Sequence, residues 1–91
     1  MPILVVAENV GATAEQDAAL VKAMDLEGSP PAGARIRLAG PTADGWRIVS
    51  LWDSEADFER FRDERLAPAL TAIGRGLPPF QIWPIETVHR F

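Results

Sequence analysis

Few side chains in this 91-residue sequence can exchange a proton near neutral pH, and His89 is the first candidate. It is the single histidine, and imidazole has an ordinary pKa close to physiological pH. If His89 faces a cavity between sheet and helices, it could deprotonate a phenol or an acidic carbon. The alternative is a histidine at the edge of the last strand, hydrogen-bonded or solvated, with no part in catalysis.

Pro2 is a second candidate base, because removal of Met1 would leave a secondary amine at the chain terminus. Nearby arginines and apolar walls can lower the pKa of such an amine. Met1-Pro2-Ile3 followed by residues 11–16 resembles the opening of the tautomerase superfamily, in which an N-terminal proline is the general base. The resemblance ends after the first predicted helix, so tautomerase is a minority alternative and His89 ranks first.

Two further polar residues could contact a substrate. Asn9, at the end of the first apolar run, could donate to an oxyanion, or it could simply cap the strand. Arg65 falls on the apolar stripe of a predicted helix, where it could pair with a substrate carboxylate or enolate. The alternative for Arg65 is an extended side chain that reaches solvent or pairs with an acidic residue, namely Asp53, Asp57 or Glu86.

Aromatic residues are abundant, with three Trp and four Phe. They could wall a pocket for an aromatic substrate, although such side chains more often fill a core. Both can hold, because cavity walls in a small domain are also core, and at least two of the Trp should be structural. The candidate substrate-binding aromatics are Trp46, Trp52, Phe58, Phe61 and Trp83.

Hydrophobic periodicity and capping residues divide the chain into strands and helices. The expected elements are a strand at 3–7 buried on both faces, a helix from Thr13 to about 26, a strand at 34–39, a turn at 40–45, a strand at 46–53, a helix from Ser54 to about 73 and a strand at 80–91. Thr13 and Gln16 form a capping box that starts the first helix.

The strand at 46–53 and the second helix each contain one feature that bears on the site or the fold. Trp46, Ile48, Ser50 and Trp52 alternate along one face of a strand, where Ser50 has no neighbouring base to make it a nucleophile. Pro68 should kink the second helix, because proline lacks the amide hydrogen.

Pro84 suggests a bulge or an edge position in the last strand.

Arg35 and Arg37 share one strand face and are expected to meet Glu8 or Glu86 where two copies of the chain join.

The order βαββαβ predicts one α+β domain over residues 1–91. The expected fold is ferredoxin-like, with an antiparallel sheet in strand order 4-1-3-2 and both helices on one face. The other sheet face carries Trp and aliphatic residues and cannot remain in water as one large patch. A second sheet laid against it would make a homodimer.

The segment Gly45–Phe61 resembles the strand-to-helix junction of the dimeric α+β barrel superfamily, near the antibiotic biosynthesis monooxygenase-like group. Its Trp52, Ser54, Glu55 and Phe58 carry the pattern, and residues 3–9 and 84–89 are similar too. The resemblance implies a dimeric barrel. The group that this segment resembles includes cofactor-free oxygenases of polyketide quinols, polyketide cyclases, haem-degrading enzymes and members of unknown role.

The haem-degrading branch carries an Asn at the end of the first strand, then a Trp and a His in the second helix. Asn9 matches, but Phe61 stands at the Trp position and Thr71 about where the His would be. We therefore expect no haem and no other cofactor. The absence of cysteine and the single histidine also predict no metal site.

A net charge of −4 argues against a nucleic-acid partner, which would need a basic surface. The apolar start, residues 2–7, is too short to span a membrane and lacks the basic flank of a signal peptide, which predicts a cytoplasmic protein. The expected function is binding of a small hydrophobic, aromatic or polyketide-like molecule, with cofactor-free oxygenase or cyclase chemistry as its enzymatic form. A non-catalytic ligand-binding or stress-related dimer is the alternative.

Overall fold

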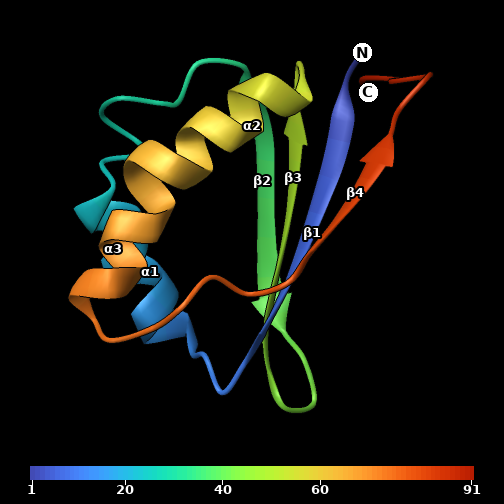
Figure 1. Ribbon diagram of the computed structural model, residues 1–91. Helices are drawn as coiled ribbons and strands as arrows, with labels where there is room; N and C mark the ends of the chain where they lie inside the picture. Colours follow the sequence, from blue (N-terminus) through green and yellow to red (C-terminus); the bar gives the residue numbers. More distant parts are fainter.

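The computed structural model describes residues 1–91, and its elements follow the predicted order (Figure 1). The four strands form one antiparallel sheet in the order β2-β3-β1-β4, as the sequence predicts. The helices cover one face of that sheet. The elements are β1 (Ile3–Val10), α1 (Ala14–Ala23), β2 (Ala34–Pro41), β3 (Gly45–Trp52), α2 (Glu55–Phe61), the π-helical turn η1 (Arg62–Leu66), α3 (Ala67–Ala72) and β4 (Phe80–Pro84).

The core lies between the helices and the inner face of the two central strands. Ile3 and Val5 of β1 and Trp52 of β3 are buried there, together with Phe58 of α2. Alternate residues of a strand point to opposite faces, so the intervening residues of β1 and β3 form the outer face. In the single chain, β1 is therefore fully buried on one face only, which corrects the expectation of burial on both.

Side-chain caps start both helical segments, as predicted. The Thr13 hydroxyl accepts a hydrogen bond from the backbone amide of Gln16 at 3.2 Å, and Ser54 does the same for Asp57 at 3.2 Å. The reciprocal half of the expected capping box is absent, because the Gln16 side chain accepts from Arg75 instead. The caps therefore depend on local sequence, while the Gln16 contact depends on the tertiary fold.

The second helical segment is interrupted earlier than the proline suggests. We predicted a kink at Pro68, but this residue lies in the first turn of α3, where a missing amide hydrogen does no harm. The irregularity falls in the preceding turn, which widens into the π-helical segment Arg62–Leu66. A widened turn is the expected response, because the proline ring would otherwise crowd the carbonyl four residues before it.

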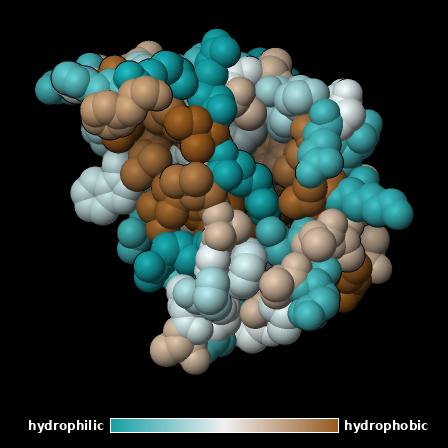
Figure 2. Space-filling model, turned by 180° about the vertical axis from the view of Figure 1, so that it is seen from behind, coloured by the Kyte–Doolittle hydropathy of each residue, from teal (hydrophilic) through white to brown (hydrophobic).

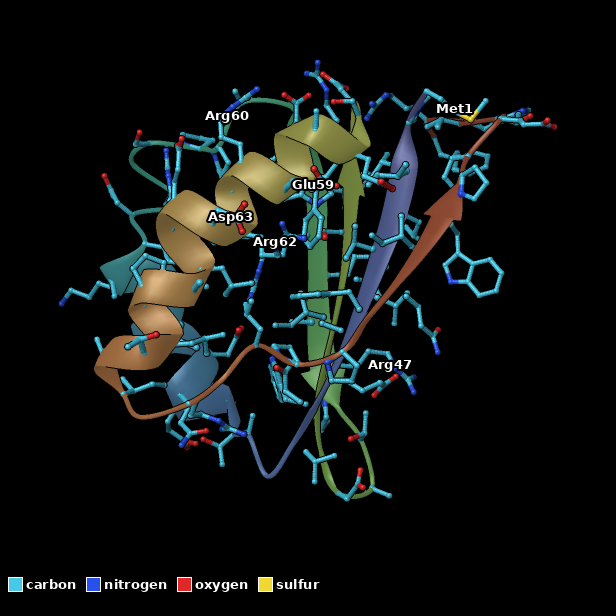
Figure 3. All side chains as sticks on the ribbon, in the orientation of Figure 1. Met1, Arg47, Glu59, Arg60, Arg62 and Asp63 are labelled. Carbon is cyan, nitrogen blue, oxygen red and sulfur yellow. The ribbon has the colours of Figure 1, made fainter.

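The outer sheet face is apolar and uncovered in the single chain. Figure 2 shows hydrophobic residues in two groups separated by hydrophilic ones, and the larger group lies on the side of the sheet. The strand register sets these side chains in two rows across the sheet: Ile36, Leu51, Leu4 and Trp83 form one row, and Leu38, Val49, Val6 and Gln81 the other. Arg47 and Glu8 form an ion pair on the same face, and Figure 3 shows Arg47 on the side of the sheet away from the helices.

The last strand is shorter than predicted. We expected it to reach residue 91, but β4 ends at Pro84, which is the final strand residue. Pro84 is not a bulge, but it does lie on an edge strand, which is the other position that the sequence suggests. One further backbone hydrogen bond, from Ile85 to the carbonyl of Pro2 at 2.9 Å, continues the β1–β4 pairing. The two ends of the chain consequently lie close together (Figures 1 and 3). None of the helices combines the length and the hydrophobicity that a membrane span requires.

Candidate functional site

A cavity of about 250 Å³ lies between the helices and the inner face of the sheet. Most of its walls are hydrophobic, and they come from every strand and from both helical segments. The predicted residues that line it are Asn9, Trp52, Phe58 and Phe61. The structure therefore brings four of the eight candidate site residues together around one space.

Aromatic rings form one wall of this cavity. The Trp52 ring lies 5.7 Å from the Phe58 ring in an edge-to-face arrangement and 5.1 Å from the Phe61 ring. Phe80 of β4 extends the wall with an edge-to-face contact to Phe58 at 5.1 Å. Such geometry is favourable for aromatic pairs, so these rings form a closely packed apolar wall.

Polar groups line the same cavity. The guanidinium of Arg37 donates two hydrogen bonds to the carboxylate of Asp17, one of them 3.1 Å long, and the Asp17 side chain is almost fully buried. Ser50 faces the same space, and its hydroxyl accepts a hydrogen bond from the Trp52 indole nitrogen at 2.9 Å. The cavity can thus hold an apolar body with a polar end.

The Asp17–Arg37 pair was missed in the sequence, although two signals mark it. Asp17, Leu20 and Met24 have helical spacing and share the face of α1 that lines the cavity. Arg37 stands opposite Ser50 in the β2–β3 register and so points to the inner face. The expectation that Arg35 and Arg37 would meet Glu8 or Glu86 is wrong, because Asp53 and Asp17 bind them within the chain.

Asn9 stands beside Trp46 at the far end of β1. Its side-chain amide donates to the Trp46 carbonyl at 3.3 Å and to the Ala7 carbonyl at 3.4 Å. Gly45 allows this close approach, since a Cβ there would lie 2.1 Å from the Asn9 carbonyl oxygen. Asn9 is therefore held in place by the backbone of β3 while it lines the cavity.

Three of the other candidates lie elsewhere. His89 follows the last strand, is exposed and is not among the cavity-lining residues. Trp83 stands opposite Leu4 on the outer sheet face, where it is 55% exposed. Pro2 is also exposed and outside the cavity. The prediction of a catalytic base required a side chain that faces this cavity, and neither His89 nor Pro2 does so.

Arg65 has a different partner from those expected. Its guanidinium donates to the backbone carbonyls of Met24 and Ser29, and the bond to Met24 is 3.2 Å long. It pairs with none of Asp53, Asp57 and Glu86, and it is not a lining residue. Arg65 instead fastens the loop after α1 to the second helical segment, and so supports the shape of the cavity.

Asp53 and Arg35 form a two-pronged ion pair near one end of the sheet, with nitrogen-to-oxygen distances of 2.7 and 2.6 Å. The hydrogen bonds from Arg35 hold the pKa of Asp53 below its ordinary value. Because the folded-state pKa is depressed, the pair stabilises the fold above the unfolded-state pKa and loses that contribution as pH falls through the folded-state pKa. We expect Arg35→Gln to raise the pKa of Asp53 in a carboxyl NMR titration. An unchanged value would show that Arg35 is not the cause.

No three His, Asp or Glu side chains gather as a group that could hold a metal ion.

No protein-family model matches the sequence, and no curated protein matches it significantly.

Solved structures, in contrast, match along almost the whole chain. Rv0793 from Mycobacterium tuberculosis has a TM-score of 0.68 and 17% identity over 98% of this chain and 100% of its own. A Chloroflexus aurantiacus protein, provisionally assigned as an antibiotic biosynthesis monooxygenase, has a TM-score of 0.66 and 15% identity over 99% of this chain and 98% of its own.

A variant of SnoaB, a cofactor-independent oxygenase from Streptomyces nogalater, has a TM-score of 0.62 and 12% identity over 96% of this chain and 95% of its own. Identities at this level establish the fold and leave the reaction open. The chain has the ferredoxin-like α+β fold that these antibiotic biosynthesis monooxygenase-like structures share, as the resemblance at Gly45–Phe61 predicts.

Proposed function

We propose that the cavity between sheet and helices binds a small, largely apolar ring compound. The observation that carries the proposal is the cavity of about 250 Å³ with aromatic rings on one wall and polar side chains on another. Apolar clefts with a few placed polar groups are the usual form of small-molecule sites. The fold is shared with SnoaB, a cofactor-independent oxygenase, and the aromatic rings in the cavity wall favour a ligand with rings of its own, of the aromatic or polyketide-like kind.

In its enzymatic form, the proposal is a cofactor-independent oxygenase or a cyclase. Both reactions begin with loss of a proton from an acidic carbon or phenol, so they need a base and a group that stabilises the anion. Asn9 lines the cavity and is our candidate for the second role. Asp17 is the one carboxylate among the lining residues, whereas His89 as the base stays a prediction. Binding without catalysis is the alternative form.

Filling the cavity should weaken binding. We expect tetralin, a two-ring hydrocarbon, to bind the wild-type protein saturably in a calorimetric titration. Leu20 lines the cavity, so Leu20→Trp should weaken tetralin binding by about tenfold or more through loss of space. Val21 follows it in α1 without lining the cavity, which makes Val21→Trp the matched control. Absent saturable binding, or equal weakening in both variants, would contradict the proposal.

We also propose that two copies of the chain pair through the outer sheet face. Apolar residues of this face come from all four strands and include exposed Ile36, Leu38 and Trp83. Burying such a surface is favourable by roughly 25 cal/mol for each Å² of apolar area.

Cytoplasmic localisation remains a further prediction.

A further inference from the structure

The inner face of α1 is unusual for a helix that lies on a sheet. Within α1, Asp17 is the only buried residue, Leu20 and Val21 are half-buried and the others are exposed. A surface helix is ordinarily held against a sheet by a stripe of apolar side chains. Here Asp17 and Leu20 face the cavity, so α1 has little direct contact with the strands beneath it.

A second, smaller space lies under the first two turns of α1. It has a volume of about 30 Å³ and is bordered by Gln16, Asp17 and Leu20 of α1 and by Trp46 and Ile48 of β3. Trp46, which the sequence suggested as a wall of the ligand site, thus borders this small space and not the main cavity. Open space therefore separates α1 from β3 here as well as over the main cavity.

Arginines from two other parts of the chain hold the start of α1. Arg37 of β2 donates two hydrogen bonds to Asp17. Arg75, in the segment after α3, donates to the Gln16 side chain at 2.8 Å and to the Val10 carbonyl at 2.9 Å. Polar contacts across the open space therefore replace the apolar packing that α1 lacks.

A third arginine holds the other end of the helix. Met24 ends α1, and its carbonyl accepts a hydrogen bond from Arg65 of η1 at 3.2 Å. Arg65 also donates to the Ser29 carbonyl in the loop that follows. The contacts of Arg65 with Ser29 and of Arg75 with Gln16 are exposed, so water can replace them at a small net cost when they break.

The chain on either side of α1 contains points about which the helix can turn. Gly11 precedes it with a φ of +78°, and no atom lies within 4 Å of the place that a Cβ would occupy. Asp25 follows it with a φ of +53°. Hinges are commonly a few loop or terminal residues that absorb a change in backbone angles. A helix with polar contacts at both ends and such residues beyond them is suited to move as one rigid unit.

We propose that α1 is a lid over the cavity, held shut by Arg37, Arg65 and Arg75, and that it lifts as a unit to admit and release the ligand. The inference rests on the proposed function and extends it from what the cavity binds to how the ligand enters. A lid fastened by polar contacts suits this site, because lifting α1 separates little apolar surface that was packed between helix and sheet.

Stopped-flow measurement of tetralin binding tests the lid, followed by tryptophan fluorescence, to which Trp52 in the cavity wall contributes. Arg65→Gln should raise the association and dissociation rate constants together by about fivefold or more, because both entry and exit require the lid to open. The dissociation constant should change by less than about twofold, since the lid is loosened equally in the free and bound protein. Arg62→Gln is the matched control in the same turn, because Arg62 pairs with Asp63 and should leave both rates unchanged.

Thiol accessibility tests the lid without a ligand. The chain has no cysteine, so Leu20→Cys places a single thiol on the cavity face of α1. Adding Arg65→Gln should speed its reaction with iodoacetamide by about fivefold or more. Ala19→Cys, at an exposed position of the same helix, should react at the same rate with and without Arg65→Gln.

The outcomes separate a lid from a structural contact. A rise in the dissociation rate alone would show that Arg65 supports the shape of the site and does not hold a lid. Unchanged rates for tetralin, or an unchanged reaction rate for Leu20→Cys, would also overturn the inference. If Arg65→Gln folds poorly, Arg75→Gln loosens the other end of α1 and should give the same increases. Failure of tetralin to bind the wild type would remove the proposed function, while thiol accessibility would still decide on the lid.

Discussion

Trp52→Ala is expected to lower the free energy of unfolding by about 3–5 kcal/mol, as large aromatic-to-alanine changes in a core do. Trp52 is 3% exposed and joins Ile3, Val5 and Phe58 in the buried cluster. Its removal would enlarge the cavity and leave the Ser50 hydroxyl without the indole donor that it now binds at 2.9 Å. Both effects destabilise the same region.

Urea unfolding followed by circular dichroism measures this change, with midpoint and slope fitted separately. Trp52→Phe keeps a ring and should cost less than Trp52→Ala. Ile73→Ala, at an exposed position after α3, is the surface control and should stay within about 0.5 kcal/mol of the wild type. A wild-type midpoint for Trp52→Ala would mean that this side chain does not organise the core.

Leu38→Glu is expected to convert a dimer into a monomer. Leu38 is 61% exposed in the single chain, so the glutamate should be accommodated without unfolding the protein. In a sheet-to-sheet dimer, each copy would bury an unpaired carboxylate, at a cost of about 3 kcal/mol or more. The dissociation constant should therefore rise by at least about a hundredfold.

Sedimentation equilibrium tests the assembly at micromolar concentration. The wild type should have twice the 9.9 kDa mass of one chain, and Leu38→Glu should have the mass of a single chain. Ile73→Glu changes an exposed apolar residue on the helical side and should leave the dimer intact. A monomeric wild type would refute pairing through the outer face.

Local patterns in the sequence were sufficient for the architecture. Alternation along residues 46–52 correctly predicts which side chains of β3 share one face, and Thr13 and Ser54 correctly mark both helix starts. The strand order also follows, because short antiparallel connections leave few topologies for βαββαβ. The exact ends were less predictable: β1 and β2 each run past their predicted boundary, and β4 stops early.

The site was predicted only in part. The sequence by itself determined that a small α+β domain would enclose aromatic side chains, including Trp52, Phe58 and Phe61, and that Asn9 would end a strand beside them. Only the tertiary structure decided that Asp17 meets Arg37, that Arg65 binds a loop and that His89 lies outside the cavity. The physical reason is the distance along the chain over which each kind of interaction acts. Alternation and capping act between neighbours in the chain, whereas the partner of a charged side chain is chosen by elements that pack together from distant parts of it.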